Sequence, residues 1–145
     1  MSRDAKSFDL PDFLPYLLNQ AAEAASLEFQ KIYKGRYGML RTDWRVLFHL
    51  GVYGPLTAKD IASRAGIHKT KISRAVTRLE KLRFLTRKRD ANDRRFETLR
   101  LTPSGIAAFR DLRDAAQKYD AALTRDFRKE DTTMLREMLK RVAQS

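Results

Sequence analysis

The sequence predicts a mainly helical fold with one small β-hairpin, an α+β chain that forms a single domain over residues 1–145. Apolar residues recur at helical spacing over most of the chain, and a glycine near residue 66 separates two short helical stretches. Between Phe84 and Leu101 the pattern changes to two strand-like segments around a turn. A chain of this length with 43% apolar residues can build one core.

The first predicted element is a long helix. Pro11 and Pro15 fit its entrance, because the first amides of a helix have no intrahelical partner. Apolar residues at helical spacing extend it from Leu14 to about Lys34. Gly35 and Gly38 are then expected to interrupt it.

A second, shorter helix is expected to follow. Thr42 is its predicted N-cap, and the helix is expected to close near Gly51. Gly54 and Pro55 indicate the turn after it. The apolar residues that would face the core are Trp44, Leu47, Phe48 and Leu50.

Two further helices are predicted on either side of Gly66. Thr57 and Asp60 have the spacing of a capping box, so the first of these helices begins there and runs to Ala65. The second runs from about Lys69 to Leu82. Its apolar residues share one face, and they are Ile72, Val76, Leu79 and Leu82.

The hairpin and the C-terminal helices complete the predicted order. Residues 84–87 and 96–101 have strand composition, and residues 90–93 have turn composition. Thr102 followed by Pro103 predicts the start of a helix whose apolar stripe extends to Phe127. A last helix is expected to be capped by Asp131 or Thr132.

The charge of the chain is strongly positive and concentrated. The net charge is +12, with a pI near 10.3. Residues 64–100 hold thirteen basic and four acidic side chains, so nine of those twelve net charges lie there. This favours a polyanionic partner, first of all nucleic acid; the alternative is a basic surface that only keeps the chain soluble.

Several classes of protein and site are not predicted. There is no cysteine, which excludes disulfides and thiolate metal sites, and no cofactor or metal site is indicated. The N-terminus does not read as a signal peptide, and no apolar run is long enough to cross a bilayer, so we expect a cytoplasmic protein without a membrane partner. His49 lies in an apolar run and is interpreted as a core or interface residue. Because no nucleophile and base stand out, we expect no enzyme.

The helix from Lys69 suits the major groove of double-stranded DNA. A helix fits that groove, and its first turns usually reach the base edges. The polar side chains opposite its apolar face are Lys69, Thr70, Lys71, Ser73, Arg74, Thr77 and Arg78. The alternative is an ordinary solvated surface helix.

The hairpin is predicted to be a second contact with DNA. Its candidate side chains are Arg87, Lys88, Arg89, Arg94 and Arg95. An arginine at such a tip can enter the narrow minor groove while its neighbours contact phosphates. Asp93 is interpreted as structural, because a carboxylate can fix a neighbouring guanidinium through a bidentate pair. The alternative for residues 87–89 is protection of a strand edge by charge.

With these elements in this order, the sequence resembles the MarR family of bacterial winged helix-turn-helix regulators. The resemblance rests on WRVLFHL with GPLTAKDIA, on HKTKISRAVTRLEKLRFL and on DANDRRFETLRLTPSG, and the flanking helices extend it over nearly the whole chain. It implies a winged helix-turn-helix lobe over residues 40–102, with long dimerisation helices in residues 10–36 and 103–145. It further implies a recognition helix over Lys69–Arg78 and a wing tip at residues 93–95. The implied function is transcriptional control, usually repression relieved by a small molecule.

Two features qualify this resemblance. His68 stands before the recognition helix where serine or aspartate is common, and it is interpreted as a plain turn residue in preference to a cap acceptor or a phosphate contact. The first helix and the helix from Pro103 are also longer than the small lobe can cover. Their apolar stripes therefore predict a homodimer, and the alternative is that they fold back on each other within one chain.

An effector site is expected where the first and second helices meet, because the family commonly binds ligands there. The candidate side chains are Tyr16, Tyr37, Arg41, Trp44 and Arg45. Aromatic walls with cationic groups would suit a small aromatic carboxylate or another anion. The alternatives are that Trp44 packs in the core and that Arg45 forms an internal salt bridge.

The most serious rival function is sequence-indifferent binding of nucleic acid by an architectural or RNA-binding protein. Bulk charge would serve both functions, and both release counterions on binding. The ratio of specific to non-specific affinity separates them.

Overall fold

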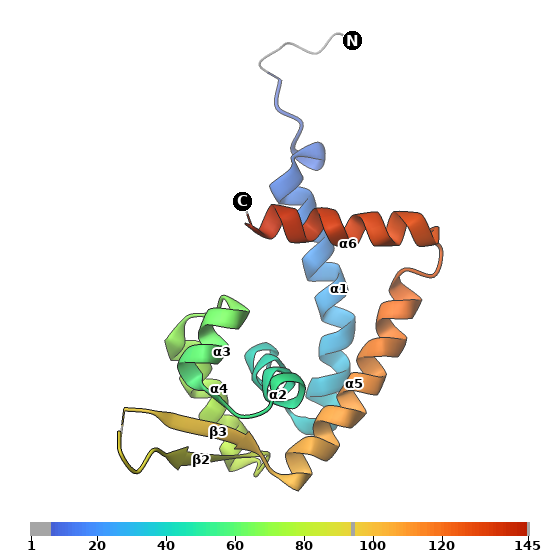
Figure 1. The fold of residues 1–145 in the computed structure, drawn as a ribbon. Coiled ribbons are helices and arrows are strands. Elements are labelled where there is room, and N and C mark those ends of the chain that lie inside the picture. Colours follow the sequence, from blue (N-terminus) through green and yellow to red (C-terminus); the bar gives the residue numbers. More distant parts are fainter. Residues whose placement is uncertain (1–6, 94, 145) are drawn as a thin grey trace.

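The computed structural model describes residues 7–93 and 95–144 (Figure 1). A short 3₁₀ turn at Leu10–Asp12 precedes α1 (Leu14–Tyr37) and α2 (Arg41–Tyr53). Strand β1 (Leu56–Thr57), α3 (Ala58–Ala65) and α4 (Lys69–Lys81) follow. The chain then forms β2 (Leu85–Arg89), β3 (Glu97–Leu101), α5 (Pro103–Leu123) and α6 (Lys129–Gln144). The predicted fold class, mainly α with a small β wing, is confirmed.

Helix α1 is longer than predicted. It continues through Gly35 to Tyr37 and ends at Gly38, whose φ of 68° is the left-handed conformation that glycine adopts at helix C-termini. The amide of Gly38 donates to the carbonyl of Lys34. Gly35 is therefore a helical residue, and the interruption expected there was wrong.

The limits of α2 also differ from the prediction. Leu40 is its N-cap residue, and the side chain of Asp43 accepts the Leu40 amide at 2.8 Å, so the cap expected at Thr42 was wrong. The helix passes through Gly51 and ends at Tyr53, just before Gly54 with a φ of 80°.

The two short helices on either side of Gly66 are confirmed. Thr57 and Asp60 form the expected capping box, in which each side chain accepts the backbone amide of the other. Gly66 ends α3 with a φ of 65°. Helix α4 then buries Ile72, Ala75, Val76 and Leu79 on one face.

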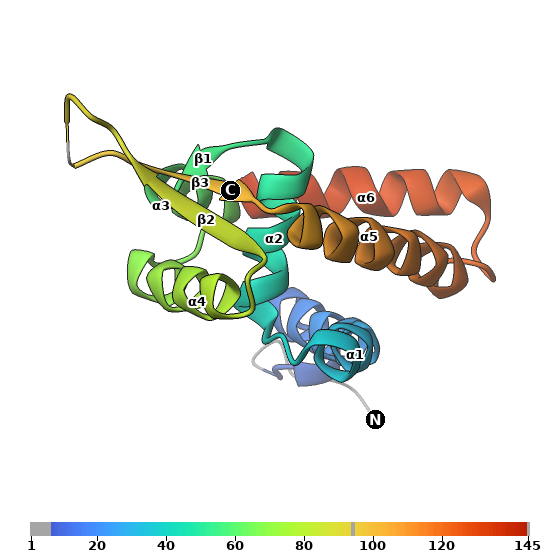
Figure 2. The ribbon, with the colours of Figure 1, turned by 90° about the horizontal axis from the view of Figure 1, so that it is seen from below.

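The sheet has three antiparallel strands in the order β1-β3-β2. The predicted hairpin pairs Leu85 with Leu101 and Arg89 with Glu97. Strand β1 was missed, because it is only two residues long and pairs with β3 more than 40 positions away. This third strand attaches the hairpin to the start of α3 (Figure 2).

Helix α5 starts as predicted, with the hydroxyl of Thr102 accepting the amide of Gly105 at 3.0 Å and with Pro103 in the first turn. It ends at Leu123, so Phe127 lies beyond it and the predicted stripe was too long. Helix α6 begins at Lys129, which places Asp131 and Thr132 in its first turn instead of at its cap.

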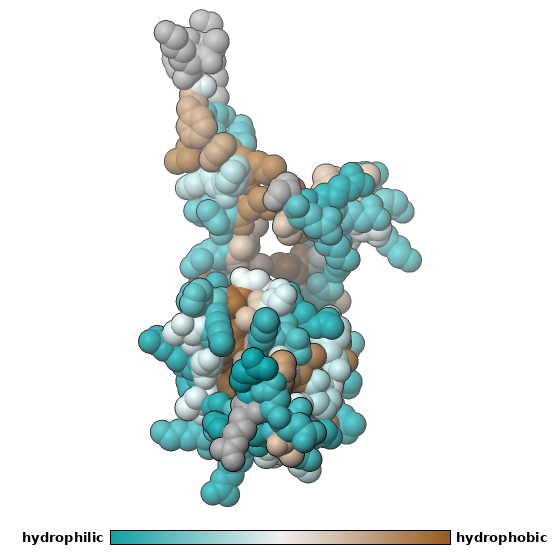
Figure 3. All heavy atoms as spheres, turned by 60° about the vertical axis from the view of Figure 1, so that its left-hand side comes forward, coloured by the Kyte–Doolittle hydropathy of each residue, from teal (hydrophilic) through white to brown (hydrophobic). Residues whose placement is uncertain are grey.

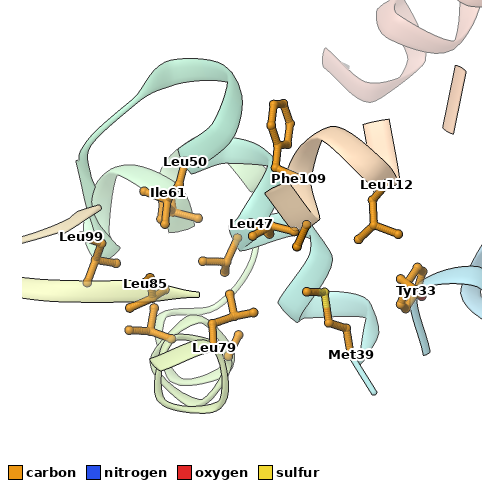
Figure 4. Packing of buried hydrophobic residues seen from close by; sticks show 14 of the residues in the cluster. Tyr33, Met39, Leu47, Leu50, Ile61, Leu79, Leu85, Leu99, Phe109 and Leu112 are labelled. Atoms are coloured by element: carbon orange, nitrogen blue, oxygen red, sulfur yellow. The ribbon is translucent and has the colours of Figure 1, made fainter. Parts of the chain in front are cut away.

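The core lies in the lobe formed by α2–α4, the sheet and the first half of α5, and the second half of α1 adds Phe29 and Tyr33 to it. In Figure 4, Leu47 and Leu50 of α2 lie between the sheet residues Leu85 and Leu99 and the α5 residues Phe109 and Leu112. All six are buried, together with Leu79 of α4. This packing fixes α4 and the hairpin to one rigid body.

Outside the lobe, large apolar side chains stay exposed. Helix α6 has no buried residue, and Met134, Leu135 and Met138 are 41–55% exposed. The N-terminal part of α1 is also apolar, and Figure 3 shows a hydrophobic surface there above a mostly hydrophilic lobe. Within residues 7–93 and 95–144, no helix is both long and apolar enough to cross a membrane.

Candidate nucleic-acid interface

Helix α4 presents a polar face to solvent. Lys69, Thr70, Lys71, Ser73, Arg74 and Thr77 are all exposed. The opposite face is fixed in the core by Ile72, Val76 and Leu79, which are at most 1% exposed. The helix can therefore offer its first two turns to a partner without unpacking the lobe. Figure 2 shows α4 and the β2–β3 hairpin projecting from the same part of the molecule.

His68 caps this helix. Its Nδ1 accepts the backbone amide of Thr70 at 3.1 Å, and its backbone is extended, as an N-cap requires. The prediction of a plain turn residue was wrong. Because Nδ1 must be unprotonated to accept this hydrogen bond, the cap requires a neutral imidazole.

Arg78 turns inward from α4 to the start of α2. Its Nε donates to the two carboxylate oxygens of Asp43 at 2.9 and 3.1 Å, and its Nη2 lies 2.8 Å from Oδ1. The Asp43 side chain is 1% exposed and also holds the Leu40 amide. The pair thus links α4 to the N-terminus of α2. The sequence predicted a free polar side chain at Arg78, whereas the structure pairs it with Asp43.

Arg87 joins the hairpin to α4. Its Nε donates to Glu80 at 3.1 Å, and its Nη2 donates to the hydroxyl of Thr77 at 3.0 Å. Its Nη1 donates to Glu97 of β3 at 3.2 Å. All three guanidinium nitrogens are used, and the side chain is only 33% exposed. Arg87 therefore links the hairpin to α4, and its predicted contact with DNA stays a prediction.

The tip of the hairpin contains the predicted carboxylate clamp. Asp93 accepts Nε and Nη2 of Arg95 at 3.0 and 2.9 Å, and it also accepts the Arg95 backbone amide. The guanidinium of Arg95 lowers the pKa of Asp93 below its usual range. The Arg95 side chain remains 86% exposed, so it is held in one pose and still accessible. Arg94 lies outside the described residues.

The remaining cations of the hairpin are exposed. Lys88 and Arg89 are both open to solvent on β2. Arg89 is 67% exposed, and its Nε lies 3.9 Å from Glu97. This contact is too long for a hydrogen bond, so Arg89 keeps its donors available.

A cavity of about 350 Å³ lies between α1, α2 and the second half of α5. Arg41, Trp44 and Arg45 line it, as predicted for the effector site. Sequence reasoning missed the residues that α1 and α5 contribute, because a pattern along one helix does not show which other helix faces it. The missed aromatic residues are Phe29, Tyr33 and Tyr119.

The cavity is lined by aromatic rings, by Arg41 and Arg45, and by Asp120, whose carboxylate pairs with Arg136. Trp44 packs edge-on against Phe29, with ring centroids 5.3 Å apart, so it is both a core contact and a cavity wall. Within the described part of the chain, neither Arg41 nor Arg45 forms an ion pair, and the internal salt bridge considered for Arg45 is absent there. Burial raises the pKa of Tyr33, which Arg41 partly opposes.

Two predicted effector residues lie elsewhere. Tyr37 sits at the end of α1, where its hydroxyl donates to Asp111 of α5 at 2.6 Å and its ring contacts Phe84. Burial and this bond raise the pKa of Tyr37 to about 12. Tyr16 is exposed near the start of α1 and does not line the cavity. Neither residue lines this cavity, so the structure does not bring them together with Arg41, Trp44 and Arg45.

Comparison with known proteins gives one consistent result. The sequence model of the MarR family matches residues 37–95. The HTH-type transcriptional regulator FarR of Neisseria gonorrhoeae is 30% identical over 105 residues, which cover 72% of this chain and 71% of FarR. The homoprotocatechuate degradative operon repressor of Escherichia coli is 28% identical over 132 residues, 88% of each chain. Among solved structures, NadR in complex with 4-hydroxyphenylacetate has a TM-score of 0.76 at 25% identity, covering 99% of this chain and 98% of NadR.

Proposed function

The chain belongs to the MarR family of transcriptional regulators, and from this premise we propose that it represses transcription as a homodimer on a pseudo-palindromic operator until a small-molecule effector releases it. The observation that carries the proposal is the exposed polar face of α4 beside an accessible arginine clamp. Lys69, Ser73 and Arg74 would meet base edges in the major groove.

The hairpin would supply a second contact. Arg95, fixed by Asp93 and 86% exposed, suits the narrow minor groove, whose negative potential attracts a guanidinium. Arg89 would pair with phosphate. Arg78 and Arg87 would act indirectly, because they hold α4 and the hairpin in the orientation that DNA binding needs.

The exposed apolar faces support the homodimer. Leu14 and Leu17 of α1 are 44–54% exposed, and α6 exposes Met134 and Leu135 to a similar extent. A water-soluble chain gains by covering such surface, and a second copy offers the same surface in return. Twofold symmetry then predicts half-sites about 10 bp apart, or a multiple of that spacing.

The cavity between α1, α2 and α5 supports a small effector. Its volume of about 350 Å³ is in the range of ligand pockets, and Arg41 and Arg45 could pair with a carboxylate beside the ring of Trp44. NadR binds 4-hydroxyphenylacetate, an aromatic carboxylate of this kind. We expect a ligand of the same class here.

The experiment for DNA binding is selection of bound fragments from the source genome, followed by titration of the best fragment and of a shuffled duplex at equal salt. A specific regulator should prefer its operator by ~10³ or more. Arg74→Ala should reduce that ratio about tenfold or more, as expected for the loss of one base contact. Equal affinity for both duplexes would support the rival, sequence-indifferent binding instead.

Lys81→Ala is the matched control, because Lys81 is an exposed residue in the last turn of the same helix and its loss changes the charge equally. It should weaken binding to both duplexes to the same extent and leave the ratio unchanged. Arg95→Ala should weaken operator binding without changing the oligomer. Normal operator affinity in that variant would remove Arg95 from the interface.

The effector is tested by adding 4-hydroxyphenylacetate and related aromatic carboxylates to the operator complex. Release should follow, and Arg45→Gln should raise the concentration that releases half of the DNA by about tenfold, since one charged contact is lost. The Arg45→Gln variant should bind the operator with the affinity of the wild type when no effector is present. An unchanged release midpoint would exclude Arg45 from the effector site.

A further inference from the structure

A second cavity, of about 470 Å³, lies on a different part of the lobe. It is formed by the C-terminal end of α2, the following turn, β3 and the first half of α5. The cavity described above uses the opposite ends of α2 and α5, and the two share no lining residue. The second cavity is therefore a separate feature of the molecule.

The floor of this cavity is apolar and closely packed. Phe109 of α5 is 8% exposed and lies against Gly51 of α2, where an added Cβ would be 2.4 Å from the phenyl ring. Leu50 and Leu101 line the floor beside it, and Ile106 is 39% exposed at its edge. A ligand with an apolar body could cover this surface and gain from the removal of water.

Three arginines surround that floor: Arg100 from β3, and Arg110 and Arg113 from α5. In residues 7–93 and 95–144, Arg100 and Arg110 form no ion pair or side-chain hydrogen bond. Arg113 has only its neighbour Asp114, at 3.3 Å from Nη2, and its guanidinium lies 5.8 Å from the centre of the Phe109 ring.

Within the described residues, Arg100 and Arg110 lack the carboxylates that balance charge elsewhere in the lobe, whereas Arg113 has Asp114. Arg78 and Arg87 each meet an acidic partner, whereas no described residue that lines this cavity is acidic. Arg110 and Arg113 are three residues apart on one helix, so their side chains lie on the same side of it. An anion in the cavity could therefore pair with the unpartnered Arg110 beside Arg100.

We infer that this cavity is a binding site for a small organic anion, a carboxylate with an aromatic or aliphatic body. The carboxylate pairs with Arg100 and Arg110, for which guanidinium groups are well suited because they can donate two parallel hydrogen bonds. The apolar body covers Phe109 and Ile106. The site is independent of the effector pocket and of DNA binding.

The first test is an NMR titration of the full-length wild-type protein with 2-naphthoate. The methyl signal of Ile106 should shift with saturation, while the methyl signal of Ile72, buried in α4, should stay in place. The neutral alcohol 2-naphthalenemethanol should shift Ile106 at least tenfold more weakly. If the alcohol binds equally well, or if Ile106 does not respond to either compound, the inference is wrong.

The second test uses calorimetry in an Arg41→Gln/Arg45→Gln background, which removes the cations of the effector pocket. Adding Arg100→Gln and Arg110→Gln should weaken 2-naphthoate binding at least tenfold. Arg125→Gln is the control, because Arg125 is exposed and outside both cavities. Undiminished binding after loss of Arg100 and Arg110 would overturn the site.

Inorganic phosphate, titrated in the same way, tests the apolar part of the inference. It should bind at least tenfold more weakly than 2-naphthoate. Equal binding would mean a simple anion site and would overturn the proposed ligand class. Because none of these measurements involves DNA, they remain informative if the proposed operator binding is wrong.

Discussion

Arg78 and Arg87 show how far residue roles can be predicted from a one-dimensional pattern. Both lie in basic segments of the sequence, where helical or strand spacing predicts the same exposed, DNA-facing role as for the neighbouring cations. Their acidic partners decide their roles, and Asp43 lies 35 positions before Arg78. The only signal was an aspartate in register with the core residues Val46 and Leu50 of α2. The clamp of Asp93 on Arg95 could be predicted because it is local.

The Asp43–Arg78 pair leads to a prediction about stability. Arg78→Ala should lower the free energy of unfolding by about 3 kcal/mol, because it leaves the carboxylate of Asp43 buried without its partner. Asp43→Asn combined with Arg78→Ala should recover part of this loss, since no charge is then buried. Urea unfolding at equal protein concentration measures both. Arg74→Ala is the exposed control on the same helix, with an expected change within about 0.5 kcal/mol.

An equal loss in Arg74→Ala and Arg78→Ala would contradict this role of the pair. So would a double variant that is less stable than Arg78→Ala alone. Either result would mean that the buried carboxylate is not the cause of the loss.

Tyr37 leads to a prediction about alkaline pH. Its pKa in the folded chain is about 12, above the ordinary value of 10.0, chiefly because of burial and then because of Asp111. The fold therefore favours the neutral phenol, and the stability that Tyr37 contributes is present below pH 10 and is lost as pH rises toward 12. Tyr37→Phe should reduce the fall in unfolding free energy between pH 9 and pH 11, as measured by urea titration. A fall as steep as in the wild type would show that Tyr37 does not titrate with folding.

At the scale of elements, the sequence predicted every α-helix of the described residues, but it missed the 3₁₀ turn at Leu10–Asp12 and misplaced several helix ends. Gly35 and Gly51 were interpreted as breaks, yet both lie inside helices, because tertiary packing outweighs the propensity of a single glycine. Gly51 is in fact required by the Phe109 ring above it, a contact between residues 58 positions apart. Strand β1 was invisible for the same reason, since only its pairing with β3 defines it.

The two helical glycines should respond in opposite ways to alanine. Gly51→Ala should destabilise the protein by about 1–3 kcal/mol, because its Cβ would meet the Phe109 ring at 2.4 Å. Gly35→Ala should stabilise it by up to about 1 kcal/mol, since nothing lies within 4 Å and alanine favours the helix. Thermal and urea unfolding of both variants measure the difference. Two changes of the same sign would contradict the assigned packing.

At the scale of the whole molecule, the described chain has one lobe with a closely packed core and two helical arms, the N-terminal part of α1 and helix α6, whose apolar faces are exposed. The lobe could be predicted well, because its helices and hairpin follow from local patterns. The arms could be predicted as helices only. In the proposed homodimer a second copy would cover them, and the sequence indicates this only as apolar surface that the lobe cannot cover.

The apolar face of α6 should therefore determine the oligomeric state. Leu135→Glu should yield a monomer in sedimentation velocity at about 10 µM, because a buried, unpaired charge in an apolar interface is strongly unfavourable. Lys140→Glu, an exposed polar position on the same helix, is the control and should remain a dimer. A dimeric Leu135→Glu, or a monomeric wild type, would argue against pairing through α6.

The central claim is that two symmetry-related α4 helices enter successive major grooves while the hairpins reach the flanking minor grooves. A hydroxyl-radical and methylation footprint of the wild-type protein on its selected operator tests this most directly. We predict two symmetric protected half-sites whose centres are about 10 bp apart or a multiple of it, with guanine N7 protected inside each and minor-groove protection outside. A single asymmetric footprint, or uniform protection along the duplex, would contradict the account.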